Sequence, residues 1–127
     1  MNGRIGLTLT AVALLATAQV AAHHGAGVFE PEKKVTVEGT VADFQFVNPH
    51  VLIYLTVKND DGKEVRWGGE LTSPNRLARM GGPVKWHQSI LKPGDAITVT
   101  GHPARNGAPM LDITKIVDAA GAVLIDE

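Results

Sequence analysis

The chain contains no cysteine, and this absence removes several classes of chemistry at once. Without a thiol there can be no disulfide, no thiolate nucleophile and no cysteine-ligated metal site. Attachment of a lipid to a cysteine behind an export signal is excluded for the same reason. A bound transition metal would therefore need nitrogen, oxygen or thioether ligands.

The chain also lacks an excess of charge of either sign, with a formal net charge of -1 at pH 7. The only charged residue before residue 23 is Arg4, so residues 23–127 hold 11 basic and 13 acidic residues. This balance gives the phosphate backbone of a nucleic acid no electrostatic reason to bind. Internal repeats, low-complexity tracts and long runs of like charge are absent as well, and the length is that of one small domain.

What the sequence does have begins with an apolar leader. Arg4 precedes an uncharged stretch over residues 5–18, and the small residues Val20 and Ala22 suit the pocket of a signal peptidase. We therefore expect residues 1–22 to be a cleavable secretory signal, which predicts a periplasmic or secreted protein that is not attached to a membrane after cleavage. The alternative is an uncleaved anchor, because residues 5–22 are just long enough to span a bilayer.

Beyond an expected tail over residues 23–34, the hydrophobic pattern is that of β-strands. Residues 35–41 and 51–57 alternate apolar and polar side chains with period two, which predicts half-buried strands. The turn-forming run at residues 59–62 is a hairpin signal, and residues 64–71 form the expected return strand. Gly39 would let the first strand bend.

A short helix is expected next, followed by two more strands. Ser73 fits the N-cap, Pro74 fits the first helical position, and a glycine pair follows Met80. Strands are then expected over residues 96–101 and 110–117, with a short extended piece at 123–125. This element order predicts an all-β domain over residues 35–127, a small five-stranded Greek-key barrel of the OB-fold type with one helix between the third and fourth strands. The alternative is another small β-sandwich or barrel.

Several short motifs, in this order and spacing, carry a resemblance to a known family. They are His23-His24, Val37-Glu38-Gly39-Thr40-Val41, Asn48-Pro49-His50, the strand from Trp67 to Glu70, Ser73-Pro74-Asn75 and Leu91-Lys92-Pro93-Gly94-Asp95. Together they resemble the DUF6152 family of small exported bacterial proteins, which has no established function. The resemblance implies an exported small domain and supplies no activity. The connector from Gly81 to Trp86 is longer and richer in glycine than the family pattern.

The chain has five histidines, all of them after the expected cleavage site. In an OB barrel the loop after the first strand and the loop between the fourth and fifth strands open at the same end. His50 lies in the first of these loops, and His102 lies at the start of the second. A tail of about twelve residues can extend roughly 40 Å, so His23 and His24 can reach the same end. The topology therefore permits a site of two to four imidazoles.

Copper is the metal that this set of residues favours. Imidazole suits copper, zinc and nickel, and copper binds a nitrogen site most tightly among the divalent ions. If cleavage follows Ala22, the amine and the ring of His23 can chelate one ion, and His50 would complete an arrangement similar to a histidine brace. We expect a non-catalytic protein that holds or hands on a copper ion through His23, His24, His50 and His102. Copper-dependent redox chemistry at these histidines is the one enzymatic exception.

Less specific roles stay open for each of these residues. His23 and His24 can be a solvated tail, His50 can cap a turn, and His102 can be an ordinary surface residue. The competing hypothesis is an interaction module that binds a periplasmic protein partner or a small ligand without metal. Its ligand-contacting residues would lie at the barrel mouth, with Trp86 at the surface. These candidates are Phe46, Asn48, Glu70 and Trp86.

Overall fold

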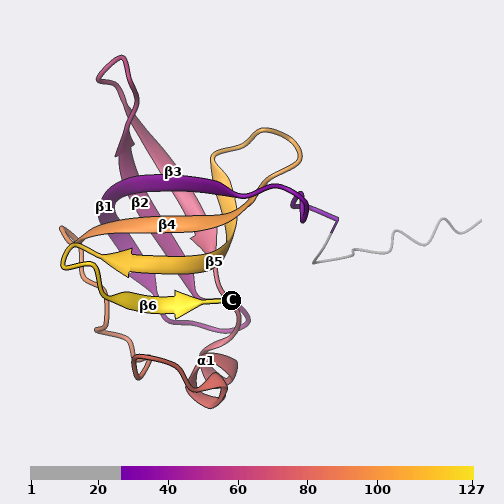
Figure 1. The fold of residues 1–127 in the computed structure, drawn as a ribbon, viewed down its shortest axis with the longest axis vertical. Coiled ribbons are helices and arrows are strands. Elements are labelled where there is room, and N and C mark those ends of the chain that lie inside the picture. The colour runs from indigo at the N-terminus through magenta and orange to yellow at the C-terminus, as the bar shows by residue number, and fades with distance from the viewer. Residues whose placement is uncertain (1–26) are drawn as a thin grey trace, which may run out of the picture.

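The computed structural model describes residues 27–127, so the expected leader, His23 and His24 lie outside the described residues. The described chain forms six strands and one helix (Figure 1). They are β1 (Val35–Gln45), β2 (Leu52–Lys58), β3 (Glu64–Glu70), α1 (Pro74–Met80), β4 (Ala96–Pro103), β5 (Met110–Asp118) and β6 (Val123–Asp126). No helix within residues 27–127 combines the length and apolar character needed to cross a membrane.

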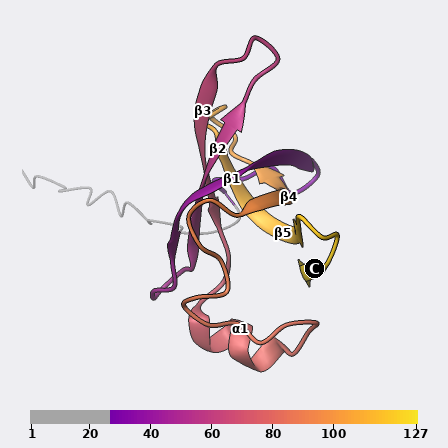
Figure 2. The ribbon, with the colours of Figure 1, turned by 90° about the vertical axis from the view of Figure 1, so that its left-hand side faces the viewer.

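Five of the strands close into a barrel. β1, β2 and β3 form an antiparallel meander, and β1 also pairs with β4, which pairs with β5. A short parallel pairing of β3 with β5 joins the two ends of the sheet, and β6 adds a further strand beside β5. Figure 2 shows α1 lying beneath the barrel. This topology confirms the predicted OB-type barrel with its helix between β3 and β4.

The bend in β1 depends on Gly39. β1 pairs with β4 up to Thr40 and with β2 from Thr40 onward, so the strand passes from one half of the barrel to the other at this point. A Cβ atom at Gly39 would lie 2.8 Å from the carbonyl oxygen of Thr56 and 2.9 Å from a methyl carbon of Val57. Close approach of the neighbouring backbone therefore explains why this residue is a glycine.

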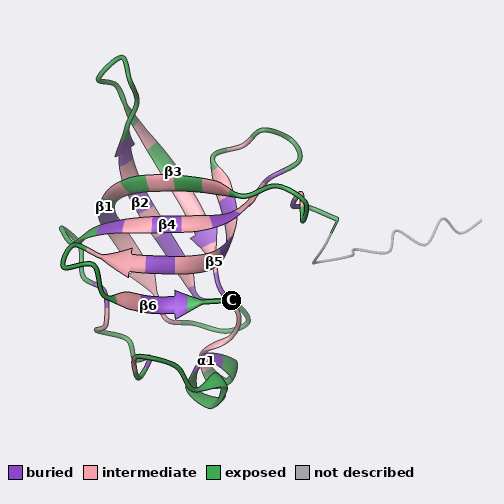
Figure 3. Cartoon of the chain, in the orientation of Figure 1, coloured by how far each residue is buried: buried purple, intermediate pink, exposed green. Residues whose placement is uncertain are grey.

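The core lies inside the barrel, and the side chains along β2 alternate between buried and more exposed positions as predicted (Figure 3). Val51 and Ile53 are 0% exposed, and Leu55 and Val57 are also buried. No polar or charged residue is buried in the described part of the chain. The barrel is therefore stabilised by apolar packing, and its polar groups lie on the outer surface, where water solvates them.

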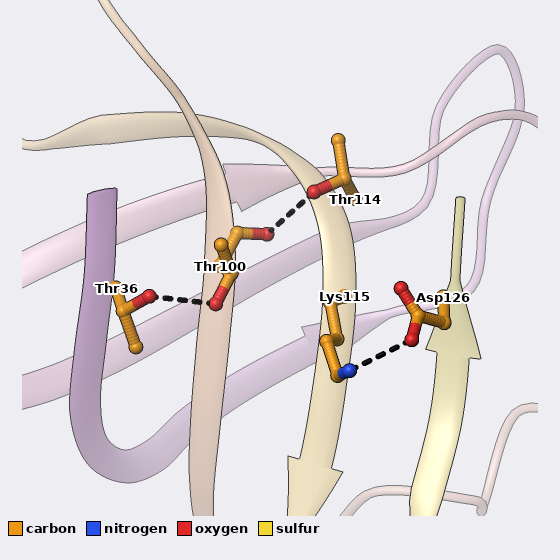
Figure 4. Close-up of polar contacts among 5 residues, drawn as sticks. All are labelled: Thr36, Thr100, Thr114, Lys115 and Asp126. Carbon is orange, nitrogen blue, oxygen red and sulfur yellow. Dashed lines mark hydrogen bonds and ion pairs between the residues drawn. The ribbon is translucent and has the colours of Figure 1, made fainter. Parts of the chain in front are cut away.

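The outer surface carries cross-strand polar contacts (Figure 4). The hydroxyl groups of Thr36 on β1 and Thr100 on β4 are 2.8 Å apart. Thr114 on β5 donates a hydrogen bond to the carbonyl oxygen of Thr100. Lys115 on β5 forms a 2.7 Å ion pair with Asp126 on β6. These contacts tie four neighbouring strands together on the side of the sheet that faces water.

Helix α1 begins and ends as the sequence predicts. The side chain of Ser73 accepts a hydrogen bond from the backbone N–H of Arg76, and Pro74 is the first helical residue. Gly81 follows the helix with a positive φ of 69°, which a side chain would disfavour. Leu77 is buried against the core.

The connector after α1 departs from expectation at Trp86. This side chain was expected at the surface, but it is only 7% exposed and belongs to the hydrophobic core. The indole covers more apolar area than any other side chain in the connector, so its burial favours packing of the connector against the barrel.

Candidate functional site

A row of polar side chains crosses three strands at one end of the barrel. His102 on β4 lies directly opposite Asp112 on β5, and Asp112 is in parallel register with Glu70 on β3. Residues at such positions have their Cα atoms about 5 Å apart. The flanking residues Gly101 and Leu111 are buried, whereas the members of the row are half-buried. Since side chains alternate along a strand, the row lies on the outer surface of the barrel.

His50 joins this row from the loop between β1 and β2. Backbone hydrogen bonds connect Val51 with Leu71 and Thr72, so the end of the loop is held beside the segment that follows β3. The Nδ1 atom of His50 is 3.1 Å from the carbonyl oxygen of Leu71. The ring is therefore anchored to the barrel although His50 itself is exposed.

His102 is anchored in the same manner. Its Nδ1 atom is 2.7 Å from the carbonyl oxygen of Lys33, in the segment that leads into β1. A carbonyl oxygen can only accept a hydrogen bond, so Nδ1 carries the proton in both His50 and His102. In the neutral ring the lone pair then lies on Nε2, which is the atom left to bind a metal or accept a further proton.

The electrostatics of Asp112 show that the two imidazoles lie near one carboxylate. Burial raises the pKa of Asp112 above its ordinary value, because the ionised form is less well solvated there. The positive charges of His102 and of His50 act in the opposite direction and lower this pKa. The positive charges of both imidazoles thus act on the same carboxylate, that of Asp112.

Sequence reasoning missed Asp112. The carboxylate expected at the barrel mouth was Glu70, which lies in register with Asp112. Asp112 becomes visible as a neighbour of His102 only when the register of β4 and β5 is known. The expected end of the fourth strand also lay two residues too early, because β4 continues to Pro103 and takes His102 into the sheet.

The chain that precedes β1 docks beside His102. The backbone N–H of Glu30 donates to Pro103 at 2.9 Å, and the N–H of Arg105 donates to Val28 at 2.9 Å. Phe29 forms a bridge with Ala104 and is buried. The described part of the expected tail therefore runs along the strand segment that begins one residue after His102.

The other candidates lie in different surroundings. His87 accepts a hydrogen bond on Nδ1 from the backbone N–H of Ser89, so its neutral ring has the opposite tautomer to His50 and His102. Phe46 is half-buried, with its ring centroid 6.1 Å from that of Phe44, and Asn48 is exposed. Trp86 lines a small cleft beside α1. Ser73 caps the helix, as expected, which gives it a structural role.

Within residues 27–127, no three histidine, aspartate or glutamate side chains are grouped closely enough to hold a metal ion. His50 and His102 are thus two anchored nitrogen donors near a carboxylate, and the described residues alone do not close a coordination sphere. His23 and His24, the other two expected ligands, lie outside the described residues.

The chain belongs to the family of unknown function DUF6152, whose model matches residues 11–111. This match confirms the resemblance carried by the sequence motifs. No curated protein and no solved structure matches the chain. The family assignment supplies no activity, so the chemistry has to be derived from the residues of the site.

Proposed function

We propose that this protein is an exported metal-binding protein, periplasmic or secreted, that holds or hands on a copper ion without catalysing a reaction. Its ligands are His50 and His102 together with His23 and His24. The apolar leader at residues 1–22 supports export, because it has the charge, length and small residues of a cleavable signal.

The observation that carries the proposal is the shared anchoring of His50 and His102. Each ring donates its Nδ1 proton to a backbone carbonyl and keeps the Nε2 lone pair free. Hydrogen bonds of this kind fix the tautomer and the orientation of metal-ligating histidines in many proteins. Both rings thus offer nitrogen donors of the kind that copper prefers.

Asp112 adds a negative charge to the same place. A dication bound by the two imidazoles would be attracted to this carboxylate, whose ionised form lacks full solvation. No ion pair with a basic residue forms at Asp112 in residues 27–127, so its charge is not already compensated by a lysine or arginine. The carboxylate therefore favours binding of a cation over binding of an anion at this site.

The docking of residues 28–30 supports the part assigned to the N-terminal histidines. These residues pair with the strand segment that follows His102. Covalent geometry allows the chain between residue 24 and Gly27 to extend by at most about 10 Å. The covalent length of the chain therefore allows His24 and His23 to reach the end of the barrel that carries His102.

The proposal is tested by calorimetric titration of Cu(II) into the processed protein that begins at His23. We expect one tight site, weakened at least about tenfold by His50→Ala and by His102→Ala, since each substitution removes one nitrogen ligand. His87→Ala is the matched control, because His87 is exposed and holds the other tautomer. One extra residue before His23 should also weaken binding, since it separates the amine from the ring.

Equal, weak binding in the wild type and all variants would overturn the copper proposal. The competing hypothesis of a metal-independent interaction module would then account for the barrel, because it makes the histidines incidental. Tight binding that depends only on the N-terminal residues would remove His50 and His102 from the site.

A further inference from the structure

A second feature lies at the end of the barrel covered by α1 (Figure 1). A cleft of about 200 Å³ lies between α1, the connector that follows it, and β6. Trp86 lines the cleft and is only 7% exposed, whereas Met80 is 41% exposed. The apolar lining consists of Leu77, Met80, Pro83, Trp86, Leu124 and Ile125.

Two arginines stand beside this cleft. Arg76, Arg79 and Met80 line a neighbouring hollow, so Met80 is shared between the hollow and the cleft. The Nε atom of Arg79 donates to the backbone carbonyl of Asn75 at 3.3 Å. Among the described residues neither arginine forms an ion pair with a carboxylate. Both guanidinium groups are therefore available to a partner.

The charge around α1 differs from that of the rest of the molecule. Residues 71–91 contain three basic residues, Arg76, Arg79 and Lys85, and no acidic residue. The remaining described residues contain 8 basic and 13 acidic residues. A group of basic residues beside α1 on an otherwise negative protein attracts a negatively charged partner to that side of the cleft.

We propose that the α1 cleft is a docking site for an acidic segment of a partner protein that carries one large apolar anchor residue. The cleft is smaller than the roughly 300–1,000 Å³ typical of small-molecule pockets, and its size suits a single side chain. The anchor enters beside Trp86, and carboxylates next to it pair with Arg76 and Arg79. Guanidinium groups recognise carboxylates in a bidentate manner, which adds specificity to the attraction.

Acidic residues on the opposite rim of the cleft determine how the partner's segment is oriented. Asp126 and Glu127 line that rim, and Asp126 is already paired with Lys115 at 2.7 Å. Carboxylates of the partner are therefore favoured on the α1 side of the anchor and disfavoured on the β6 side. A flat anionic membrane has no side chain to fill the cleft and would meet this acidic rim, so a protein segment fits better.

The test uses ¹⁹F NMR of the processed protein that begins at His23, labelled with 5-fluorotryptophan. The chain has two tryptophans, and Trp67 lies on β3 within the barrel, so it serves as an internal control. The probe is a synthetic peptide of about twelve residues with one phenylalanine followed by three aspartates in a glycine–serine background. We expect a saturable shift of the Trp86 resonance, assigned with Trp67→Phe, while the Trp67 resonance stays in place.

Peptide and protein variants decide what causes the shift. Replacing the phenylalanine by alanine, or the aspartates by lysines, should weaken binding at least about tenfold, as should the double variant Arg76→Glu with Arg79→Glu. The matched control is Lys58→Glu with Lys63→Glu, which reverses two exposed charges on the β2–β3 hairpin and should leave binding unchanged.

Three results would overturn the proposal. They are an unmoved Trp86 resonance, equal affinity for the aspartate and lysine peptides, or equal affinity of the wild type and the double arginine variant. Saturable binding to vesicles of anionic phospholipid, with none to the peptide, would assign the surface to a membrane instead. The test does not involve His50 or His102, so its outcome is independent of copper binding.

Discussion

Asp112 is the residue on which the electrostatics of the candidate site depend. It is half-buried on β5, directly opposite His102. Burial raises its pKa, and the positive charges of His102 and His50 offset only part of that rise. The ionised carboxylate is consequently less stable in the folded protein than in the unfolded chain at neutral pH.

Asp112→Asn should therefore stabilise the metal-free protein at neutral pH. The pKa of Asp112 is higher in the folded protein than the value of 3.8 in the unfolded chain. The contribution of this carboxyl group to folding stability is therefore present below pH 3.8 and is lost as the pH rises through the folded-state pKa. The asparagine variant keeps the shape of the side chain and cannot ionise. We expect its melting temperature to exceed that of the wild type at pH 7 and to show no such advantage at pH 3.

Thermal unfolding followed by circular dichroism checks this prediction. Asp60→Asn is the matched control, because Asp60 is exposed in the hairpin turn and should show no comparable difference between the two pH values. A lower melting temperature for Asp112→Asn at pH 7 would mean that the carboxylate stabilises the apo fold, contrary to the direction of its pKa.

At the scale of elements, the position of His102 depends on how β4 meets β5. The register between the strands shifts between Thr100 and Gly101, immediately before His102. Gly101 is buried, and a Cβ atom there would overlap the backbone carbonyl of Asp112. The absence of a side chain at Gly101 thus lets the two strands carrying His102 and Asp112 approach each other.

Gly101→Ala should separate β4 from β5 and disturb the site together with the fold. Overpacking in a tightly packed interior costs about 1–3 kcal/mol, and we expect the free energy of unfolding in urea to fall by that amount. Under the proposed function, copper affinity should fall with it, because β4 carries His102 and β5 carries the neighbouring Asp112. Gly27→Ala is the control, since nothing lies within 4 Å of a Cβ atom at Gly27. Equal stability of the two variants would contradict the prediction.

The sequence predicts the elements better than it predicts their contacts. The alternation in residues 51–57 specifies the buried face of β2, and Ser73 with Pro74 specifies the start of α1, because both signals are local. The pairing of His102 with Asp112 depends on a register shift between strands, which local patterns do not encode. The burial of Trp86 likewise depends on how the connector packs against the barrel.

At the scale of the whole molecule, the segment that precedes β1 connects the candidate site with the N-terminal part of the chain. Residues 28–30 run beside the strand segment that follows His102, and Phe29 is 7% exposed at their centre. The carbonyl oxygen of Lys33, which anchors His102, belongs to the same stretch before β1. Docking of this stretch therefore orients the ring of His102.

Phe29→Ala should release this segment from the barrel. Removing the buried ring takes away most of the apolar contact that holds the segment, so the amides of Glu30 and Arg105 should exchange with solvent at least about tenfold faster. Copper affinity should weaken as well. Hydrogen exchange measured by NMR checks the first effect, and Val28→Ala, at a position that is 51% exposed, is the control. Unchanged exchange at both amides would contradict the assigned role of Phe29.

The most direct test of the central claim is a Cu(II) titration of the ¹⁵N-labelled processed protein, followed through the histidine ring signals. Paramagnetic Cu(II) broadens the signals of the rings that bind it. Before copper is added, the His50 and His102 signals should be those of the tautomer protonated on Nδ1. We predict that both signals disappear before one equivalent of Cu(II) has been added, while the His87 signal stays sharp. Loss of the N-terminal histidine signals alone, or equal broadening of all rings, would contradict the claim that the anchored pair holds the metal.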